Sequence, residues 1–78
     1  MEQKLQTLDM LKEGEQARVH ALRLRGAIRR RMQDIGLIAG TQVQCVQKSP
    51  SGDPAAYRIR GAVIALRNQD ARGVEIRK

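Results

Sequence analysis

Apolar residues recur at every second position in several short segments of this 78-residue chain, a pattern typical of strands. Alternation over residues 17–25 predicts a first strand, and a change of phase after Ala21 predicts a bulge within it. Similar short runs, bounded by glycine or proline, predict four further strands at residues 41–48, 57–60, 62–66 and 73–77. Because residues 62–66 are apolar on both faces, we expect a central or sharply curved strand there.

One helix is predicted after the first strand. Ile28, Met32 and Ile35 are spaced i, i+4 and i+7, which places them in one apolar stripe on a helix over residues 27–35. Gly36 follows where a left-handed residue commonly ends a helix. On such a helix the side chains of Arg29, Arg30 and Gln33 face water.

Two shorter helical turns complete the prediction. Leu5, Leu8 and Leu11 are spaced by three before Gly14 and predict one turn near the N-terminus, and residues 68–71 predict another before the last strand. The expected fold is therefore mostly β, a small curled barrel of about five strands with one short helix. A chain of this length holds one small domain, residues 1–78.

The sequence predicts a location in the cytoplasm. Its longest apolar run, residues 62–66, is far shorter than the roughly 20 residues of a membrane-spanning helix. The N-terminal residues are polar and mixed in charge, unlike a signal peptide. A secreted chain this small usually needs several disulfides, whereas Cys45 is the one cysteine.

Catalytic and metal chemistry find little support in the sequence. Cys45 and His20 lie on different predicted strands with no second cysteine or histidine, so we expect no enzyme and no cofactor. A closed zinc site of four protein ligands cannot be built from one chain. A weak surface site, or one shared between chains, stays open, so transition metal ion binding remains an alternative without assigned ligands.

The charge distribution predicts an anionic partner. Lysine and arginine number 15 against 8 acidic residues, for a net charge of +7, and residues 18–31 hold six arginines and no acid. Single-strand binders usually stack bases on exposed aromatics, yet Tyr57 is the one aromatic residue. The helix offers no arrangement for reading DNA. A solvated basic face, used for solubility or for docking on an acidic protein, is therefore favoured, and a small basic barrel that binds RNA is the alternative.

The order of several segments resembles the FeoA family. The most specific is residues 29–43, RRRMQDIGLIAGTQV, which combines three arginines, an aspartate and two glycines at fixed spacing. It is accompanied, in the family's order, by residues 8–19, 52–54, 60–67, 70–71 and 74–76. Members usually have proline at the position of Ala39 and often leucine at that of Met32, and both departures are mild.

The resemblance implies an SH3-like barrel that acts in ferrous iron transport. Such proteins are expected to bind the cytoplasmic, GTP-hydrolysing part of a FeoB-type membrane transporter and to reach the membrane only through it. The candidate contact residues are two helix arginines and three loop residues, namely Arg29, Arg30, Ser51, Gly52 and Asp53. A weak homodimer through a barrel edge is a further hypothesis.

Overall fold

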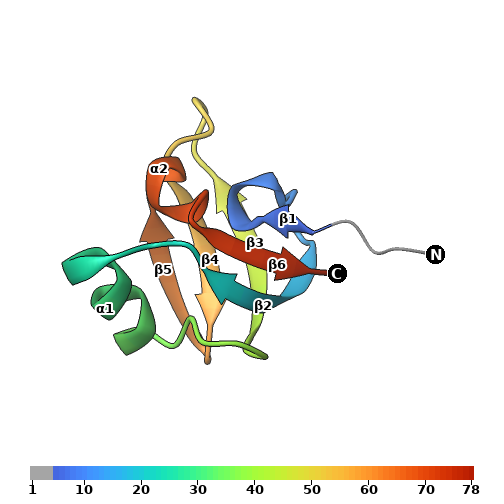
Figure 1. Ribbon diagram of the computed structural model, residues 1–78. Helices are drawn as coiled ribbons and strands as arrows, with labels where there is room; N and C mark the ends of the chain where they lie inside the picture. The colour runs from blue at the N-terminus through green and yellow to red at the C-terminus, as the bar shows by residue number, and fades with distance from the viewer. Residues whose placement is uncertain (1–4) are drawn as a thin grey trace.

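The computed structural model describes residues 5–78, which form one strongly curled antiparallel sheet with helices at its margins (Figure 1). The strands are β1 (Gln6–Thr7), β2 (Gln16–Leu22), β3 (Gln42–Lys48), β4 (Ala55–Ile59), β5 (Ala62–Leu66) and β6 (Val74–Arg77). The helical elements are the 3-10 helix η1 (Leu8–Met10), α1 (Gly26–Asp34) and α2 (Asn68–Ala71). Across the sheet the order is β1-β6-β2-β3-β4-β5, so β1 and β5 are its two edges.

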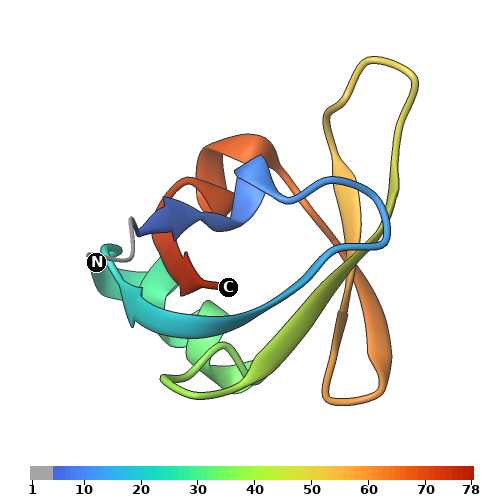
Figure 2. The ribbon, with the colours of Figure 1, turned by 90° about the vertical axis from the view of Figure 1, so that its right-hand side faces the viewer.

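The architecture confirms the mostly β, SH3-like prediction with one addition. Figure 2 shows the long strand β3 crossing between the two halves of the curled sheet. The sheet has six strands rather than five, because β1 forms by pairing Gln6 and Thr7 with Ile76 and Glu75 of β6. The hydrogen-bonded order has two ends, so the barrel is curled without being closed.

The core lies inside the curl and is aliphatic around one aromatic ring. Tyr57 is the largest fully buried side chain. Alternate residues of the strands face inward beside it, together with residues from the helical elements: Leu8, Leu11, Ala17, Val19, Met32, Leu37, Val43, Cys45, Ala55, Ile59, Leu66, Ala71, Val74 and Ile76. Burial of each large aliphatic side chain stabilises the fold by about 1.5–3 kcal/mol.

Helix α1 ends as the sequence predicts. Gly36 has φ +105°, its N–H donates to the Gln33 carbonyl, and the N–H of Leu37 donates to the Met32 carbonyl. These two bonds define a Schellman motif, in which a left-handed residue satisfies the last helix carbonyls. Met32 is buried and Ile28 and Ile35 are partly buried, which confirms the apolar stripe. Within residues 5–78 neither helix has the length and apolarity needed to cross a membrane.

The first strand is shorter than predicted. The strand contains the predicted bulge, but the β2–β6 register shifts between Val19 and Ala21 rather than after Ala21, and the strand ends at Leu22 rather than at residue 25. Leu24 leaves the sheet and packs over Gly73 so closely that a Cβ atom added at Gly73 would clash with the Leu24 side chain. The alternation therefore continues past the strand end because Leu24 still faces the core.

The position of β5 also differs from the prediction. Residues 62–66 form an edge strand rather than a central one. Ala62, Val63 and Ala65 are exposed, and Leu66 is buried. The run of apolar residues on both faces therefore belongs to an edge strand that is partly exposed. The preceding strand, β4, begins at Ala55 and stops at Ile59 because Arg60, with φ +51°, already belongs to the turn.

Candidate partner-binding surface

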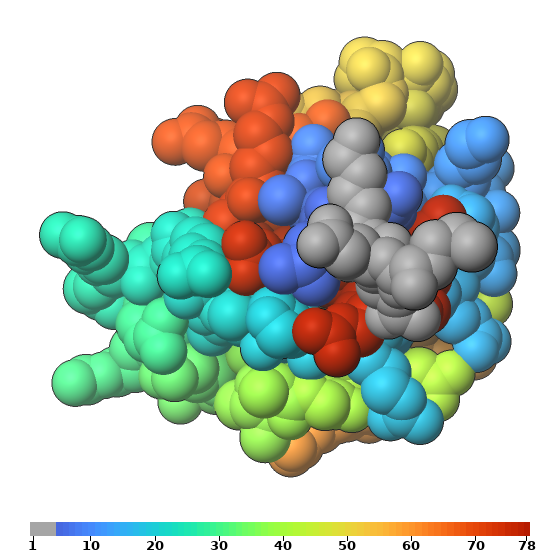
Figure 3. Space-filling model, turned by 45° about the vertical axis from the view of Figure 1, so that its right-hand side comes forward, coloured from blue at the N-terminus to red at the C-terminus, as the bar shows by residue number. Residues whose placement is uncertain are grey.

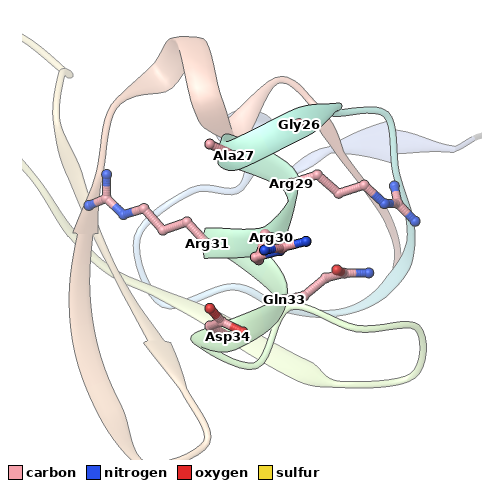
Figure 4. A pocket seen from close by; sticks show the side chains of 7 residues that line it. All are labelled: Gly26, Ala27, Arg29, Arg30, Arg31, Gln33 and Asp34. Carbon is pink, nitrogen blue, oxygen red and sulfur yellow. The ribbon is translucent and has the colours of Figure 1, made fainter.

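The exposed side of α1 presents a divergent group of arginines. Figure 4 shows Arg29 and Arg31 leaving the helix in opposite directions, with Arg30 between them. They border an open hollow of about 690 Å³ along the helix, lined by Gly26, Ala27, Arg29, Arg30, Arg31, Gln33 and Asp34. Because the arginines spread apart, the hollow suits a broad acidic surface better than one small anion.

The Arg29 side chain is hydrogen-bonded to the backbone, so the prediction that it faces water is wrong. Its Nη1 atom donates to the Leu22 carbonyl at 2.8 Å and to the Leu24 carbonyl at 3.5 Å, and the residue is partly buried. The chain leaves the sheet at this point, and the guanidinium supplies donors for the backbone there. Arg30 is exposed, as predicted, and among the described residues it makes no side-chain hydrogen bond or ion pair.

The loop that contains Ser51, Gly52 and Asp53 is fixed to the start of α2. The Asp53 Oδ1 atom accepts a hydrogen bond from the Asn68 N–H at 3.0 Å, and the Gly52 carbonyl accepts one from Asn68 Nδ2 at 3.0 Å. Gly52 has φ +86°, a conformation that favours glycine. Ser51 is exposed, and its hydroxyl donates to the Asp53 carbonyl at 3.0 Å.

The structure does not bring the helix and the loop together into one patch. Figures 1 and 2 place α1 and the loop over residues 49–54 at opposite ends of the molecule. In Figure 3 atoms of α2 lie between them. Their role in binding stays a prediction.

Strand β5 links these two ends. At its start, the aliphatic part of the Arg60 side chain lies over Gly36, which follows α1 in the chain. A Cβ atom added at Gly36 would stand 2.8 Å from the Arg60 Cδ atom. At its end, Leu66 pairs with Ala55 directly after the loop. Sequence reasoning missed this edge because a run apolar on both faces is usually a buried strand. Gly61 indicates a turn between two strands in the sequence, but a turn does not reveal which strand lies at the edge of the sheet.

The residues considered for chemistry are separated. Cys45 is buried, and burial raises the pKa of its thiol, so the neutral form dominates near pH 7. His20 is exposed on β2. Tyr57 is fully buried, and its hydroxyl donates to the Leu8 carbonyl at 3.5 Å, so the ring is unavailable for stacking on a base. Residues 5–78 contain no group of three or more histidine, cysteine or acidic side chains placed to hold a metal ion.

Fold and surface together define a small SH3-like domain with an arginine-rich helix beside an open sheet edge. The FeoA domain family matches residues 6–78, and the chain belongs to this family.

Two FeoA structures share the fold. The FeoA protein of Chlorobium tepidum is 30% identical with a TM-score of 0.86, over 92% of this chain and 69% of that one. Stenotrophomonas maltophilia FeoA, solved with zinc and described as a prokaryotic SH3 domain protein, is 31% identical with a TM-score of 0.81, over 91% and 88% of the two chains.

A curated relative carries the same domain within a much larger protein. The Porphyromonas gingivalis protein is a fusion of Fe(2+) transport protein A and the Fe(2+) transporter FeoB, and it is 35% identical over 69 residues. The match covers 88% of this chain and 8% of the fusion protein. The likeness therefore concerns the FeoA part.

Proposed function

We propose that the chain is an accessory regulator of ferrous iron uptake that binds the GTP-hydrolysing part of a FeoB-type transporter in the cytoplasm. The observation that carries this proposal is the fusion of a homologous domain to FeoB in Porphyromonas gingivalis. A fusion keeps two domains at a high effective concentration, and separate chains with the same task need an interface to meet. FeoA proteins are small transport accessories, which agrees with a binding role.

The helix α1 supplies the charge for such an interface. Arg30 is exposed, so it is available to a carboxylate of the partner. Arg29 acts indirectly, because its bonds to the Leu22 and Leu24 carbonyls hold the helix in place. In the loop, Ser51 is exposed in the same way as Arg30 on the helix. Gly52 and Asp53 fix this loop through their hydrogen bonds with Asn68.

Uptake of radioactive ferrous iron by cells tests the function. We expect deletion of the chain to change the uptake rate and the wild-type chain to restore it. Arg30→Glu should fail to restore it, whereas Arg77→Glu, an equal charge reversal at an exposed position on β6, should succeed. Protein levels are compared by immunoblot, so that loss of the chain is separated from loss of function. An uptake rate unaffected by deletion contradicts the proposal.

A further inference from the structure

Strand β5 has a free edge along its full length. It pairs with β4 on one side, from Ala62 opposite Ile59 to Leu66 opposite Ala55, and no strand of the described residues pairs with its other side. Protein sheets commonly protect such edges with charges, proline, bulges or short strands. The sequence of β5, AVIAL, contains no charge and no proline, and its pairing with β4 is regular over five residues.

The backbone groups that face this edge can be assigned from the hairpin turn. Arg60 and Gly61 both have positive φ, 51° and 83°, which is the conformation of a two-residue type I′ turn. The residues that flank such a turn form a hydrogen-bonded pair, and the pairs alternate along an antiparallel ladder. Ile64 therefore bonds to β4, whereas the N–H and C=O groups of Val63 and Ala65 point to the open edge.

Apolar side chains surround these free backbone groups. Val63 is 55% exposed and, with Ala65, lies on the outer face of the sheet. Ile64 faces the inner side and is partly buried against the core. A strand added here would gain backbone hydrogen bonds and would cover apolar surface on both faces.

Arginines flank the same edge and indicate the charge of its partner. Arg58 lies opposite Val63, while Arg60 and Arg67 precede and follow β5. All three are exposed, and none forms an ion pair with another described residue. Pairing β5 with a second copy would bring two such sets of arginines together, and like charges across strands are destabilising. An acidic segment would instead neutralise them.

We propose that the free edge of β5 binds an extended, acidic segment of the partner as an additional strand. The segment's backbone bonds to Val63 and Ala65, its apolar side chains cover Val63 and Ile64, and its carboxylates meet Arg58 and Arg67. Such a strand would run from the end of α1 to the loop over residues 49–54, the two places that β5 connects. This inference rests on the proposed function, since the partner is the transporter's GTP-hydrolysing domain.

Amide hydrogen exchange measured by NMR tests the added strand. The isotope-labelled chain is compared alone and in complex with the soluble GTP-hydrolysing domain of the same organism's FeoB-type transporter. We expect exchange at Val63 and Ala65 to slow at least tenfold in the complex, while the amides of β1 at the other edge keep their rates. Binding without protection at Val63 and Ala65 overturns the inference and leaves the proposed function standing. Absence of binding overturns both.

Two variants test the chemistry of the segment. Ala65→Pro removes an N–H that faces the open edge and should weaken binding at least tenfold, with folding checked by circular dichroism. Arg58→Glu combined with Arg67→Glu keeps the backbone intact and should weaken binding to the same extent or more. Unchanged affinity in the double variant shows that the segment is not acidic. Protection of Val63 and Ala65 that rises with protein concentration without the partner shows that a second copy occupies the edge instead.

Discussion

The two edges of the sheet differ in length, polarity and surroundings. β1 is two residues long and polar, and acidic side chains close to it form ion pairs: Asp9 with Arg72 at 3.8 Å and Glu75 with Arg23 at 3.2 Å. β5 is five residues long and apolar, and its flanking arginines have no ion-pair partner among the described residues. β1 therefore follows the usual rules for a protected edge, whereas β5 does not.

The contrast is the reason why we propose β5, rather than β1, as the edge that accepts a partner. An exposed apolar strand promotes aggregation unless charge or a bound partner covers it. The net charge of +7 keeps copies of the chain apart and still permits an acidic partner to approach. In the proposed complex the arginines beside β5 oppose pairing with a second copy and favour an acidic partner.

The largest expected effect comes from removing the support beneath β5. Tyr57 lies opposite Ile64 and is fully buried, so Tyr57→Ala should lower the free energy of unfolding by about 3–5 kcal/mol. Thr7→Ala, a truncation at the other edge, should cost less than about 1 kcal/mol because Thr7 is only partly buried and its hydroxyl bonds locally to Asp9. Urea denaturation measures both. Equal losses would show that the two edges are supported alike.

The second expected effect is a difference in stability between two arginine variants, one at Arg29, which bonds to the backbone, and one at Arg30, which is available to a partner. Arg29→Ala removes donors to the Leu22 and Leu24 carbonyls and should destabilise the protein by about 1–2 kcal/mol. The neighbouring change Arg30→Ala should stay within about 0.5 kcal/mol of the wild type, because this exposed side chain makes no hydrogen bond or ion pair with another residue of the described part of the chain. Thermal denaturation of the two variants decides the matter, and a reversed order would refute these assignments.

The third effect converts β5 into a protected edge. Val63→Glu places a carboxylate opposite Arg58 and should lower affinity for the transporter's GTP-hydrolysing domain about tenfold, which corresponds to about 1.4 kcal/mol. Because Val63 is 55% exposed, stability should change by less than about 0.5 kcal/mol. Gln6→Glu is the matched control on β1 and should leave affinity unchanged. Calorimetric titration measures both, and equal effects would remove the distinction between the edges.

The smallest expected effects are on the pH dependence of stability, and they differ between the two halves of the sheet. Near β2 and β6, bonds from Lys78 Nζ and the Lys12 N–H lower the pKa of Glu15. Its stabilising contribution is present above the carboxyl group's ordinary pKa and is lost as the pH falls through the lowered folded value. In the β3–β4 half, burial raises the pKa values of Tyr57 and Cys45, so stability falls as the pH rises above their ordinary values.

Urea denaturation as a function of pH checks these directions with two variants. Glu15→Gln should flatten the acid side of the stability profile and leave the alkaline side unchanged. Tyr57→Phe should flatten the alkaline side above about pH 10 and leave the acid side unchanged. The opposite assignment of the two variants would contradict the local origin of these pKa shifts.

Local signals in the sequence predicted the helix and most strands. The stripe of Ile28, Met32 and Ile35, with Gly36 after it, describes α1 almost completely, because both features depend on residues close in the chain. The early end of β2 depends on Leu24 packing over Gly73, far away in sequence. The edge position of β5 likewise depends on the whole sheet order, which local alternation does not contain.

The candidate surface was predictable in composition and less so in arrangement. Arginine enrichment before residue 32 is visible in the sequence, but the structural use of Arg29 follows from where the chain leaves the sheet. The bond between Asp53 and the Asn68 N–H requires the loop to fold over α2, which spacing alone does not reveal. Three-dimensional contacts therefore decide which polar residues serve the fold and which stay available.

The proposed binding to the transporter can be measured by calorimetric titration of the chain into the soluble GTP-hydrolysing domain of the same organism's FeoB-type transporter, at physiological salt. We expect saturable binding by the wild type. Arg30→Glu should weaken this binding at least tenfold, and Arg77→Glu, its charge-matched control, should retain it. Absence of binding by the wild type, or equal affinity for both variants, would contradict the claim that this domain meets its transporter through the arginine-rich side formed by α1 and β5.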